Sequence, residues 1–366
     1  MLLSSAGFFV SVVFIPVYAK DVVGATPFQI GIIVGLFSLT FLSSSYVLGR
    51  WADIHGRRIV VLSGLLASAG ATITQIFAYD PLSLAISRGL VGFASGSYPA
   101  ALLTYAYETK IKMGKFASYG SLGWGLGSFF AGLLGIYWQI FILSALLFFI
   151  GFLLALLMPF NKERLVSVPR LPIRIIRKNL PVYLTMLIRH TGANAVWVLF
   201  APYMIEILHF NFFQIGLVFA INPFFQFIIM QTSDRFSSVL LLYIGLISST
   251  LGFFLMSIAT GFLEMTLTQL FIGAGWGTLY VGSLKFIMEK NVEKATATGL
   301  LGSTLGVSSI IGPLIGGSLV TISLYFGLPD YLAYRTTFYT AAILCIIALV
   351  CLVYILRKNS TLKSFS

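Results

Sequence analysis

The amino-acid sequence predicts an all-α integral membrane protein with twelve transmembrane helices, arranged as two parallel six-helix repeats. Three observations lead to this fold class. The 366-residue chain is 58% hydrophobic and 9% charged, with a mean hydropathy of +0.97. Apolar segments of spanning length recur throughout, and the second half repeats motifs of the first. A soluble domain carries about 25% charged residues, so we expect lipid to cover this surface.

Segments of about 20 apolar residues can cross about 30 Å of hydrocarbon as α-helices. The first segment lacks the basic start and the cleavage site of a signal peptide, so we expect it to be retained. The twelve predicted spans are 1–19, 28–48, 59–78, 82–107, 117–136, 138–159, 181–205, 213–232, 239–259, 264–288, 297–323 and 332–356.

Basic residues are distributed unevenly between the connections. If both termini face the cytoplasm, the connections after the even-numbered spans and the C-terminal tail hold 18 of the 23 Lys and Arg residues. The positive-inside rule then predicts a multi-pass protein of the cell membrane with both termini cytoplasmic. The net charge of +12 reflects this topology and contact with the lipid bilayer. A nucleic-acid partner is not expected.

Motifs of the first half return in the second half in the same order. The segment FQIGIIVGL at Phe28 returns as FQIGLVFAI at Phe213, 185 residues later. Corresponding pairs at this and neighbouring offsets include Tyr18/Tyr203, Gly92/Gly273, Gly96/Gly277, Glu108/Glu289, Gly120/Gly299, Gly123/Gly302 and Gly127/Gly306.

The repeats predict the domain organisation. We expect an N-terminal six-helix bundle at 1–159, a basic cytoplasmic linker at 160–180, a C-terminal six-helix bundle at 181–356 and a cytoplasmic tail at 357–366. Repeats of this kind typically place a substrate site at their interface near the bilayer midplane. The glycine pairs spaced four apart are expected to be helix-packing contacts.

The stretch GRWADIHGRR joins the second and third spans. It resembles the signature loop of the major facilitator superfamily, whose pattern is matched by Gly49, Asp53, Gly56, Arg57 and Arg58. Gly56 allows the positive φ of a tight reversal. The two arginines are expected to hold the loop at the lipid headgroups.

The resemblance implies a cytoplasmic gate in which Asp53 latches the two halves, together with an acid at the end of span four. Ile54 stands where the family usually has a basic residue, so Arg50 or another arginine is expected to substitute. Glu108 is expected to pair with Arg50, Arg57 or Arg58, and Glu289 with Arg235 or a nearby basic residue. The predicted gate residues are Gly49, Asp53, Gly56, Arg57, Arg58, Glu108, Asp234, Arg235 and Glu289.

The resemblance also implies a secondary active transporter that works by alternating access. Proton-coupled export of an amphipathic compound is the leading prediction, because the first span resembles the drug-exporter branch of the family. Proton-coupled uptake of a sugar or an organic anion stays open, because span five lacks the Gly-Pro pattern of many antiporters and GPLIGG lies in span eleven instead. A channel or a non-transporting receptor is the alternative of another class.

The sequence does not predict an enzyme. Its three histidines are not arranged as His-Glu-x-x-His, and the sequence contains no Gly-x-Ser-x-Gly or Gly-Lys-Ser/Thr motif. Cys345 and Cys351 lie in one apolar run and are expected to be packing residues. No cofactor or metal is therefore expected, and the energy for transport must come from a gradient. A monomer is expected.

Polar side chains at helical spacing predict the substrate site, because a polar face turned to lipid would leave hydrogen-bonding groups unpaired. Helix contacts alone are nearly as good an explanation for Asn222 and Gln226. The predicted cavity residues are Arg88, Ser95, His190, Asn194, Trp197, Asn222, Gln226, Gln269, Trp276 and Tyr280.

The predicted site is aromatic and neutral to positive, since no acidic residue lies deep in spans one or seven. Small neutral or anionic amphipathic substrates are therefore favoured. His190 is the candidate proton-sensitive group, because free histidine has a pKa of about 6.5. Arg88 and Lys285 are intramembrane charges that either serve transport or reach the interface and local partners. Lys20 and Asp21 are expected in a solvated turn.

Overall fold

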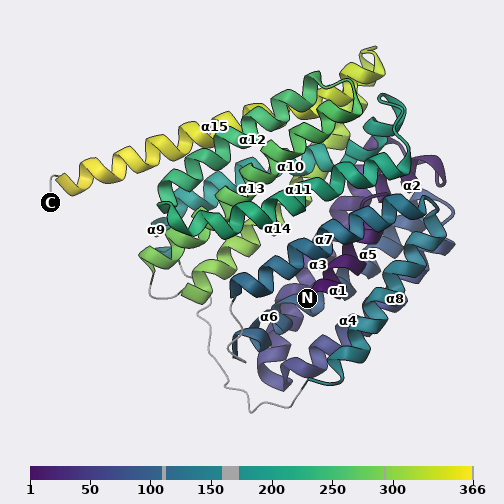
Figure 1. Ribbon diagram of the computed structural model, residues 1–366, viewed down its shortest axis with the longest axis horizontal. Coiled ribbons are helices and arrows are strands. Elements are labelled where there is room, and N and C mark those ends of the chain that lie inside the picture. The colour runs from purple at the N-terminus through teal and green to yellow at the C-terminus, as the bar shows by residue number, and fades with distance from the viewer. Residues whose placement is uncertain (109–112, 159–172, 292–293, 365–366) are drawn as a thin grey trace.

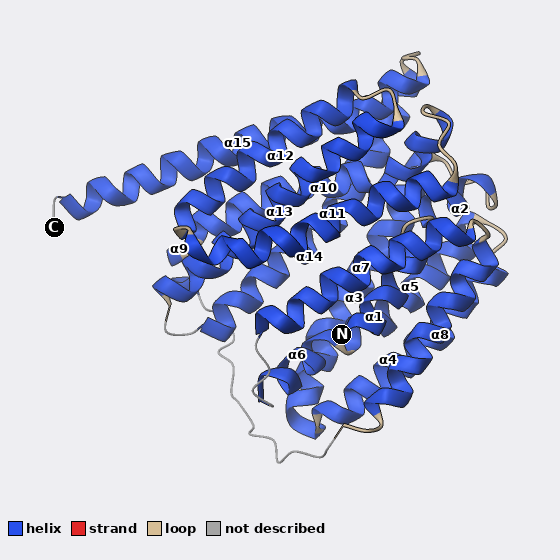
Figure 2. Ribbon diagram, viewed as in Figure 1, coloured by secondary structure: helices blue, strands red, loops and turns tan. Residues whose placement is uncertain are grey.

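A computed structural model describes residues 1–108, 113–158, 173–291 and 294–364 of the chain. Within these ranges the regular structure is entirely helical, as Figure 2 shows. The all-α prediction is therefore confirmed for the described residues.

The helices of the first half run back and forth across the molecule. They are α1 (Leu2–Val12), α2 (Ile15–Asp21), α3 (Pro27–His55), α4 (Arg57–Thr74), the 3₁₀ turn η1 (Gln75–Phe77), α5 (Pro81–Ser97), α6 (Pro99–Glu108), α7 (Met113–Leu134) and α8 (Tyr137–Ala155).

The second half continues in the same manner. Its helices are α9 (Ile173–Lys178), α10 (Leu180–Glu206), α11 (Phe212–Thr232), the 3₁₀ turn η2 (Ser233–Arg235), α12 (Ser238–Ile258), α13 (Phe262–Lys290), α14 (Lys294–Tyr325) and α15 (Asp330–Ser364).

Each predicted span coincides with one helix or with two consecutive helices. Nine helical segments of the described chain are long and apolar enough to cross a membrane. The remaining predicted spans fall on α5 with α6, on α7 and on α10. For these segments a membrane crossing stays a prediction.

Local sequence explains where several helices begin and end. Thr26, Asp80 and Asn211 cap α3, α5 and α11, and each forms a reciprocal capping box with the residue three positions later. The backbone N–H of Ser83 donates to the carboxylate of Asp80, which lowers the pKa of this carboxyl. Pro99 begins α6 after the break at Tyr98, because proline cannot continue the hydrogen bonding of α5.

The helix turns define two ends of the bundle. We call the end with the turns at Gly24, Gly135 and Gly327 the distal end. The opposite end, with the turns at Gly56 and Phe236, is the linker end. Figure 1 shows the first half in purple to blue beside the second half in green to yellow.

Among the described residues, the buried apolar cluster that combines both halves lies towards the distal end. One cluster combines first-half residues such as Phe14 and Phe141 with second-half residues such as Phe200 and Phe338. At the linker end each half has its own cluster, around Val61 in the first half and around Leu242 in the second. The described conformation is therefore packed across the halves at the distal end.

Glycines allow the close approach of helices from different halves. A Cβ atom on Gly31 would lie 2.6 Å from the carbonyl oxygen of Pro313, and one on Gly132 would lie 2.6 Å from the Cα of Gly216. These contacts join α3 to α14 and α7 to α11. They support the expectation that glycine serves packing here.

Gly302 does not make the close helix contact that was predicted for it. A Cβ on Gly302 would meet nothing within 4 Å, whereas one on Gly123, its repeat counterpart, would lie 2.4 Å from the carbonyl oxygen of Leu2. Among the described residues, no helix approaches α14 at Gly302 as closely as α1 approaches α7 at Gly123.

Candidate functional site

The signature loop is the turn between α3 and α4. Gly56 ends α3 and precedes α4 with φ of 111°, which confirms the predicted need for glycine. The structure differs from the headgroup prediction at Arg57, which is buried, whereas Arg58 is half-buried at the end of a neighbouring helix. Arg57 is 3% exposed, and Arg58 donates through Nη2 to the carbonyl oxygen of Leu156 at 2.6 Å. Because α8 ends beside this loop, its carbonyls attract the cation.

Several predicted gate side chains lie outside the described part of the structure. These are the side chains at Gly49, Arg50, Asp53, Glu108 and Asp234. Their latch role stays a prediction from the resemblance.

Glu289 has a different contact from the predicted one. Its carboxylate accepts a hydrogen bond from Ser238 Oγ at 2.7 Å, and the expected pairing with Arg235 or a nearby basic residue stays a prediction. Ser238 is the first residue of α12, so the positive end of that helix dipole faces the carboxylate. Lys285 reaches the linker end, where Nζ donates to the carbonyl oxygen of Phe236 at 2.5 Å.

Arg88 lies inside the first half. It is 2% exposed and donates to Gln75 Oε1 at 3.2 Å, while its guanidinium stands 4.1 Å from the centre of the Phe37 ring. Ser95 is fully buried and lies 3.5 Å from Ser68 Oγ. In this conformation both residues pack between helices of one half.

Three buried amides join α11 to α13. Gln226 Nε2 donates to Asn222 Oδ1 at 2.7 Å, and Asn222 Nδ2 donates to Gln269 Oε1 at 3.3 Å. The three side chains are between 1% and 3% exposed. The structure therefore supports the helix-contact explanation for Asn222 and Gln226 and extends it to Gln269.

Half-buried aromatic residues gather between α10 and α13. His190 stacks on Trp276 with ring centroids 4.8 Å apart and an interplanar angle of 26°. Trp276 in turn stacks on Tyr280 at 5.4 Å and 21°. Helical spacing on α13 and the facing surface of α10 bring together three residues that the sequence assigned to one site. We call His190, Trp276 and Tyr280 the aromatic stack.

Asn194 and Trp197 continue along the same helix as His190. Asn194 Nδ2 donates to the His190 carbonyl oxygen at 2.9 Å and lies 3.4 Å from Ser309 Oγ of α14. Trp197 packs against Phe200 and other aromatic rings of the second half. These residues extend the polar and aromatic face of α10 towards the distal end.

Arg189 is a residue that the sequence analysis missed. It is 2% exposed, donates through Nε to Ser249 Oγ at 3.1 Å, and lies 5.4 Å from the Trp276 ring centre. Its Nη2 atom is buried without a hydrogen bond to any described residue. The sequence alone could have identified Arg189 as a candidate, because an arginine within an apolar span is a candidate functional residue.

This region combines aromatic and polar side chains of α10, α13 and α14. It offers stacking surfaces, amides and a guanidinium, while the carboxylates of α10 and α13 stand at the helix ends, at Glu206, Glu264 and Glu289. Among the described residues no cluster of metal-ligating side chains is found.

Comparisons with known proteins agree with this architecture. The chain is 26% identical over 339 residues to an uncharacterised MFS-type transporter of Methanocaldococcus jannaschii, covering 84% of this chain and 85% of that protein. It is 24% identical over 347 residues to the multidrug resistance protein MdtG of Salmonella typhi, with 87% and 86% coverage.

Solved structures share the fold at low sequence identity. The nucleoside transporter NupG superposes with a TM-score of 0.78 at 12% identity, covering 96% of both chains. A bacterial homologue of the lysosomal transporter Spinster, in an inward-facing and occupied conformation, gives a TM-score of 0.76 at 13% identity, with 97% and 95% coverage. The Major Facilitator Superfamily model matches residues 1–290 and 182–366, and the chain therefore belongs to this family of membrane transporters.

Proposed function

We propose that this chain is a secondary active transporter that exports a small amphipathic molecule by alternating access, with protons as the coupling ion. The observation that carries the proposal is the unequal packing of the two halves. They share one buried apolar cluster at the distal end and have separate clusters at the linker end. This arrangement is expected for a transporter in a conformation that is closed at one end.

With the termini in the cytoplasm, as the positive-inside rule predicts, the described conformation is closed to the outside. An export substrate would then enter from the linker end. The similarity to a multidrug efflux pump of Staphylococcus aureus, which is 29% identical over 151 residues, supports export.

The aromatic stack and its surroundings support a substrate with a ring and without positive charge. Trp276 and Tyr280 offer stacking faces, and Arg189 supplies positive charge beside Trp276. An organic cation would meet this charge, while the carboxylates of α10 and α13 stand at the ends of those helices. Neutral or anionic amphipathic compounds are therefore the substrate class that we propose.

His190 is the proposed proton-sensitive group. Its ring is half-buried in the aromatic stack, and Nδ1 is buried without a hydrogen bond to the described residues. An imidazole in such a place can change its interactions when a proton arrives.

Transport by the purified protein in proteoliposomes tests the function. Preloaded unlabelled substrate should accelerate entry of labelled substrate, because exchange requires a carrier that alternates. A pore or a receptor would show no such counterflow. An imposed pH gradient should drive accumulation, and a gradient that leaves accumulation unchanged would contradict proton coupling while leaving the carrier assignment intact.

A further inference from the structure

A polar and aromatic cluster closes the distal end of the first half. The hydroxyl of Tyr137 lies 3.4 Å from Asp21 Oδ2 and donates to it. The Tyr18 ring packs edge-on against Tyr137 at 5.2 Å and against Phe141 at 5.3 Å. The carboxylate of Asp21 is thus bound by a tyrosine of its own half.

The second half carries the matching cluster. The hydroxyl of Tyr334 donates to Glu206 Oε2 at 2.9 Å. The Tyr203 ring packs against Tyr334 at 6.0 Å and against Phe338 at 5.0 Å. Tyr203 and Glu206 stand 185 positions after Tyr18 and Asp21. Both repeats therefore contain the same arrangement of two tyrosines and a carboxylate.

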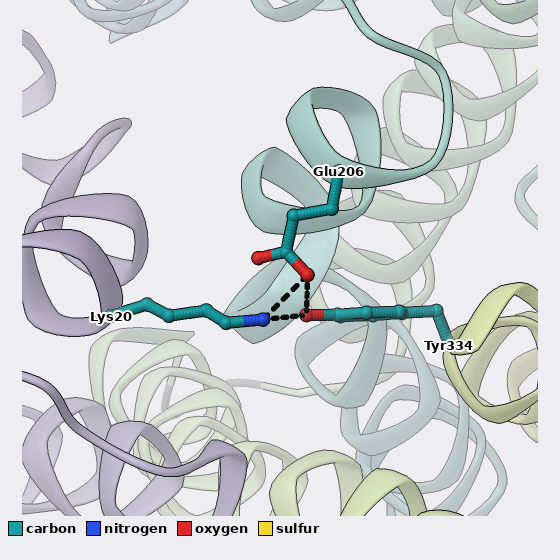
Figure 3. Close-up of polar contacts among 3 residues, drawn as sticks. All are labelled: Lys20, Glu206 and Tyr334. Carbon is teal, nitrogen blue, oxygen red and sulfur yellow. Dashed lines mark hydrogen bonds and ion pairs between the residues drawn. The ribbon is translucent and has the colours of Figure 1, made fainter.

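Lys20 breaks this symmetry. Ile205 stands at the corresponding position of the second half. Lys20 Nζ crosses to the other half, where it lies 2.5 Å from Glu206 Oε2 and donates to the Tyr334 hydroxyl at 3.1 Å (Figure 3). One basic side chain therefore links the cluster of the second half to the first.

Helix electrostatics favour the cation at this place. Lys20 is in the last turn of α2, and Glu206 is the last residue of α10. A carboxylate at a helix C-terminus opposes the helix dipole, whereas a cation there is stabilised. Lys20 thus neutralises Glu206 and faces the negative ends of two helices. The side chains are 35% and 27% exposed, so water screens the pair only in part.

We propose that Lys20, Glu206 and Tyr334 form a latch that holds the distal end closed and must open when the transporter alternates. Tyr334 positions the pair, because its hydroxyl donates to Glu206 and accepts from Lys20. The latch stands on the end where the two halves share their apolar cluster. The inference rests on alternating access but not on the identity of the substrate.

Distances between spin labels test the latch without any substrate. Cys345 and Cys351 are first replaced by alanine. One label pair is placed at the distal end on the exposed residues Tyr79 and Leu263, and a second pair at the linker end on Leu157 and Phe236. Double electron–electron resonance then reports the opening of each end in the full-length protein.

Lys20→Gln and Glu206→Gln should lengthen the distal distance and shorten the linker distance. The ratio of distal-open to distal-closed protein should rise about fivefold, as expected for loss of a partly exposed ion pair. Tyr334→Phe should give a smaller shift in the same direction. The reversed pair, Lys20→Glu with Glu206→Lys, should restore the wild-type distribution.

Asp21→Asn is the matched control, because Asp21 is the repeat counterpart of Glu206 and is bound within its own half. It should leave the distal end closed. Wild-type distances in both single variants would overturn the latch. Distal opening by Asp21→Asn of the same size would also overturn it, as would a reversed pair that behaves like the single variants.

Discussion

The imidazole of His190 and the indole of Trp276 stack across α10 and α13 at a centroid distance of 4.8 Å. This contact joins α10 to α13, which is three passes later in the chain, and it lies near the middle of both helices. Together with Tyr280 it forms a continuous aromatic surface. A ring of the substrate could replace or extend such a stack, and this leads to the first prediction.

Trp276→Ala should weaken substrate binding about tenfold, because aromatic pairs contribute about 0.5–1.5 kcal/mol beyond their buried area. Trp276→Phe keeps a stacking face and should retain most of the affinity. Titration of the purified protein by calorimetry measures both. Trp138, which is 53% exposed outside the stack, provides the control Trp138→Ala. Equal affinity in Trp276→Ala and this control would remove the stack from the binding site.

His190→Gln should reduce the pH dependence of transport, because glutamine keeps a polar side chain but does not take up a proton. Initial rates in proteoliposomes at a series of pH values give the profile. His209, at the distal end with positive φ, supplies the comparison His209→Gln. A His190→Gln profile that follows the wild type would assign proton coupling to another group.

Asp53→Asn should increase labelling of single cysteines placed along the linker-end face of α14, such as at Ser303. The reason is that Asp53 is predicted to latch the linker end when the distal end opens. Membrane-permeant and impermeant maleimides, compared in membranes, measure this exposure. Unchanged labelling with intact transport would remove Asp53 from the gate.

Much of the fold follows from local sequence. The spans are predictable because each needs only enough apolar residues to cross the bilayer. The turn at Gly56 follows from backbone sterics alone. The burial of Arg57 could not be predicted from local sequence, because it depends on how α4 packs against other helices. An arginine at this position of the loop is equally compatible with contact to the lipid headgroups.

The candidate site was less predictable than the helices, because it also depends on how helices pack against one another. Helical spacing predicted inward faces with His190 on α10 and with Trp276 and Tyr280 on α13, and the three rings stack in the structure. Their role in substrate binding stays a prediction. Lys20 was expected in a solvated turn, yet it lies in the last turn of α2 and pairs with Glu206, 186 positions away. A contact between the halves depends on their relative placement, which no local pattern encodes.

Glycine packing gives a prediction on stability. Gly316→Ala should lower the free energy of unfolding by about 1–3 kcal/mol, as expected for overpacking, because a Cβ there would lie 2.2 Å from the Ala195 carbonyl oxygen. Gly302→Ala should be neutral or stabilising, since its Cβ would meet nothing within 4 Å and alanine favours helix. Thermal unfolding in detergent compares them. Equal destabilisation by both substitutions would contradict the packing account.

Arg189 gives the last prediction, which concerns substrate charge. Its guanidinium is buried beside Trp276, with one donor bonded to Ser249 and Nη2 without a described partner. A buried cation in this state favours an anionic group, since a charge-assisted hydrogen bond contributes about 1.5–3 kcal/mol. Naphthalene-2-sulfonate and the neutral naphthalene-2-sulfonamide share a ring and differ in charge, so they serve as a probe pair.

Arg189→Gln should weaken binding of the sulfonate by at least about tenfold and change binding of the sulfonamide little. Arg335→Gln removes the same charge from the same half at the distal end, where the guanidinium contacts Tyr203 and the Ala259 carbonyl, and should leave both affinities near the wild type. Arg189→Lys should restore part of the sulfonate affinity, because it keeps the charge but loses the planar fork of donors. Equal losses for both probes in Arg189→Gln would indicate a structural role for this residue, and tighter sulfonate binding would reverse the charge argument for the whole site.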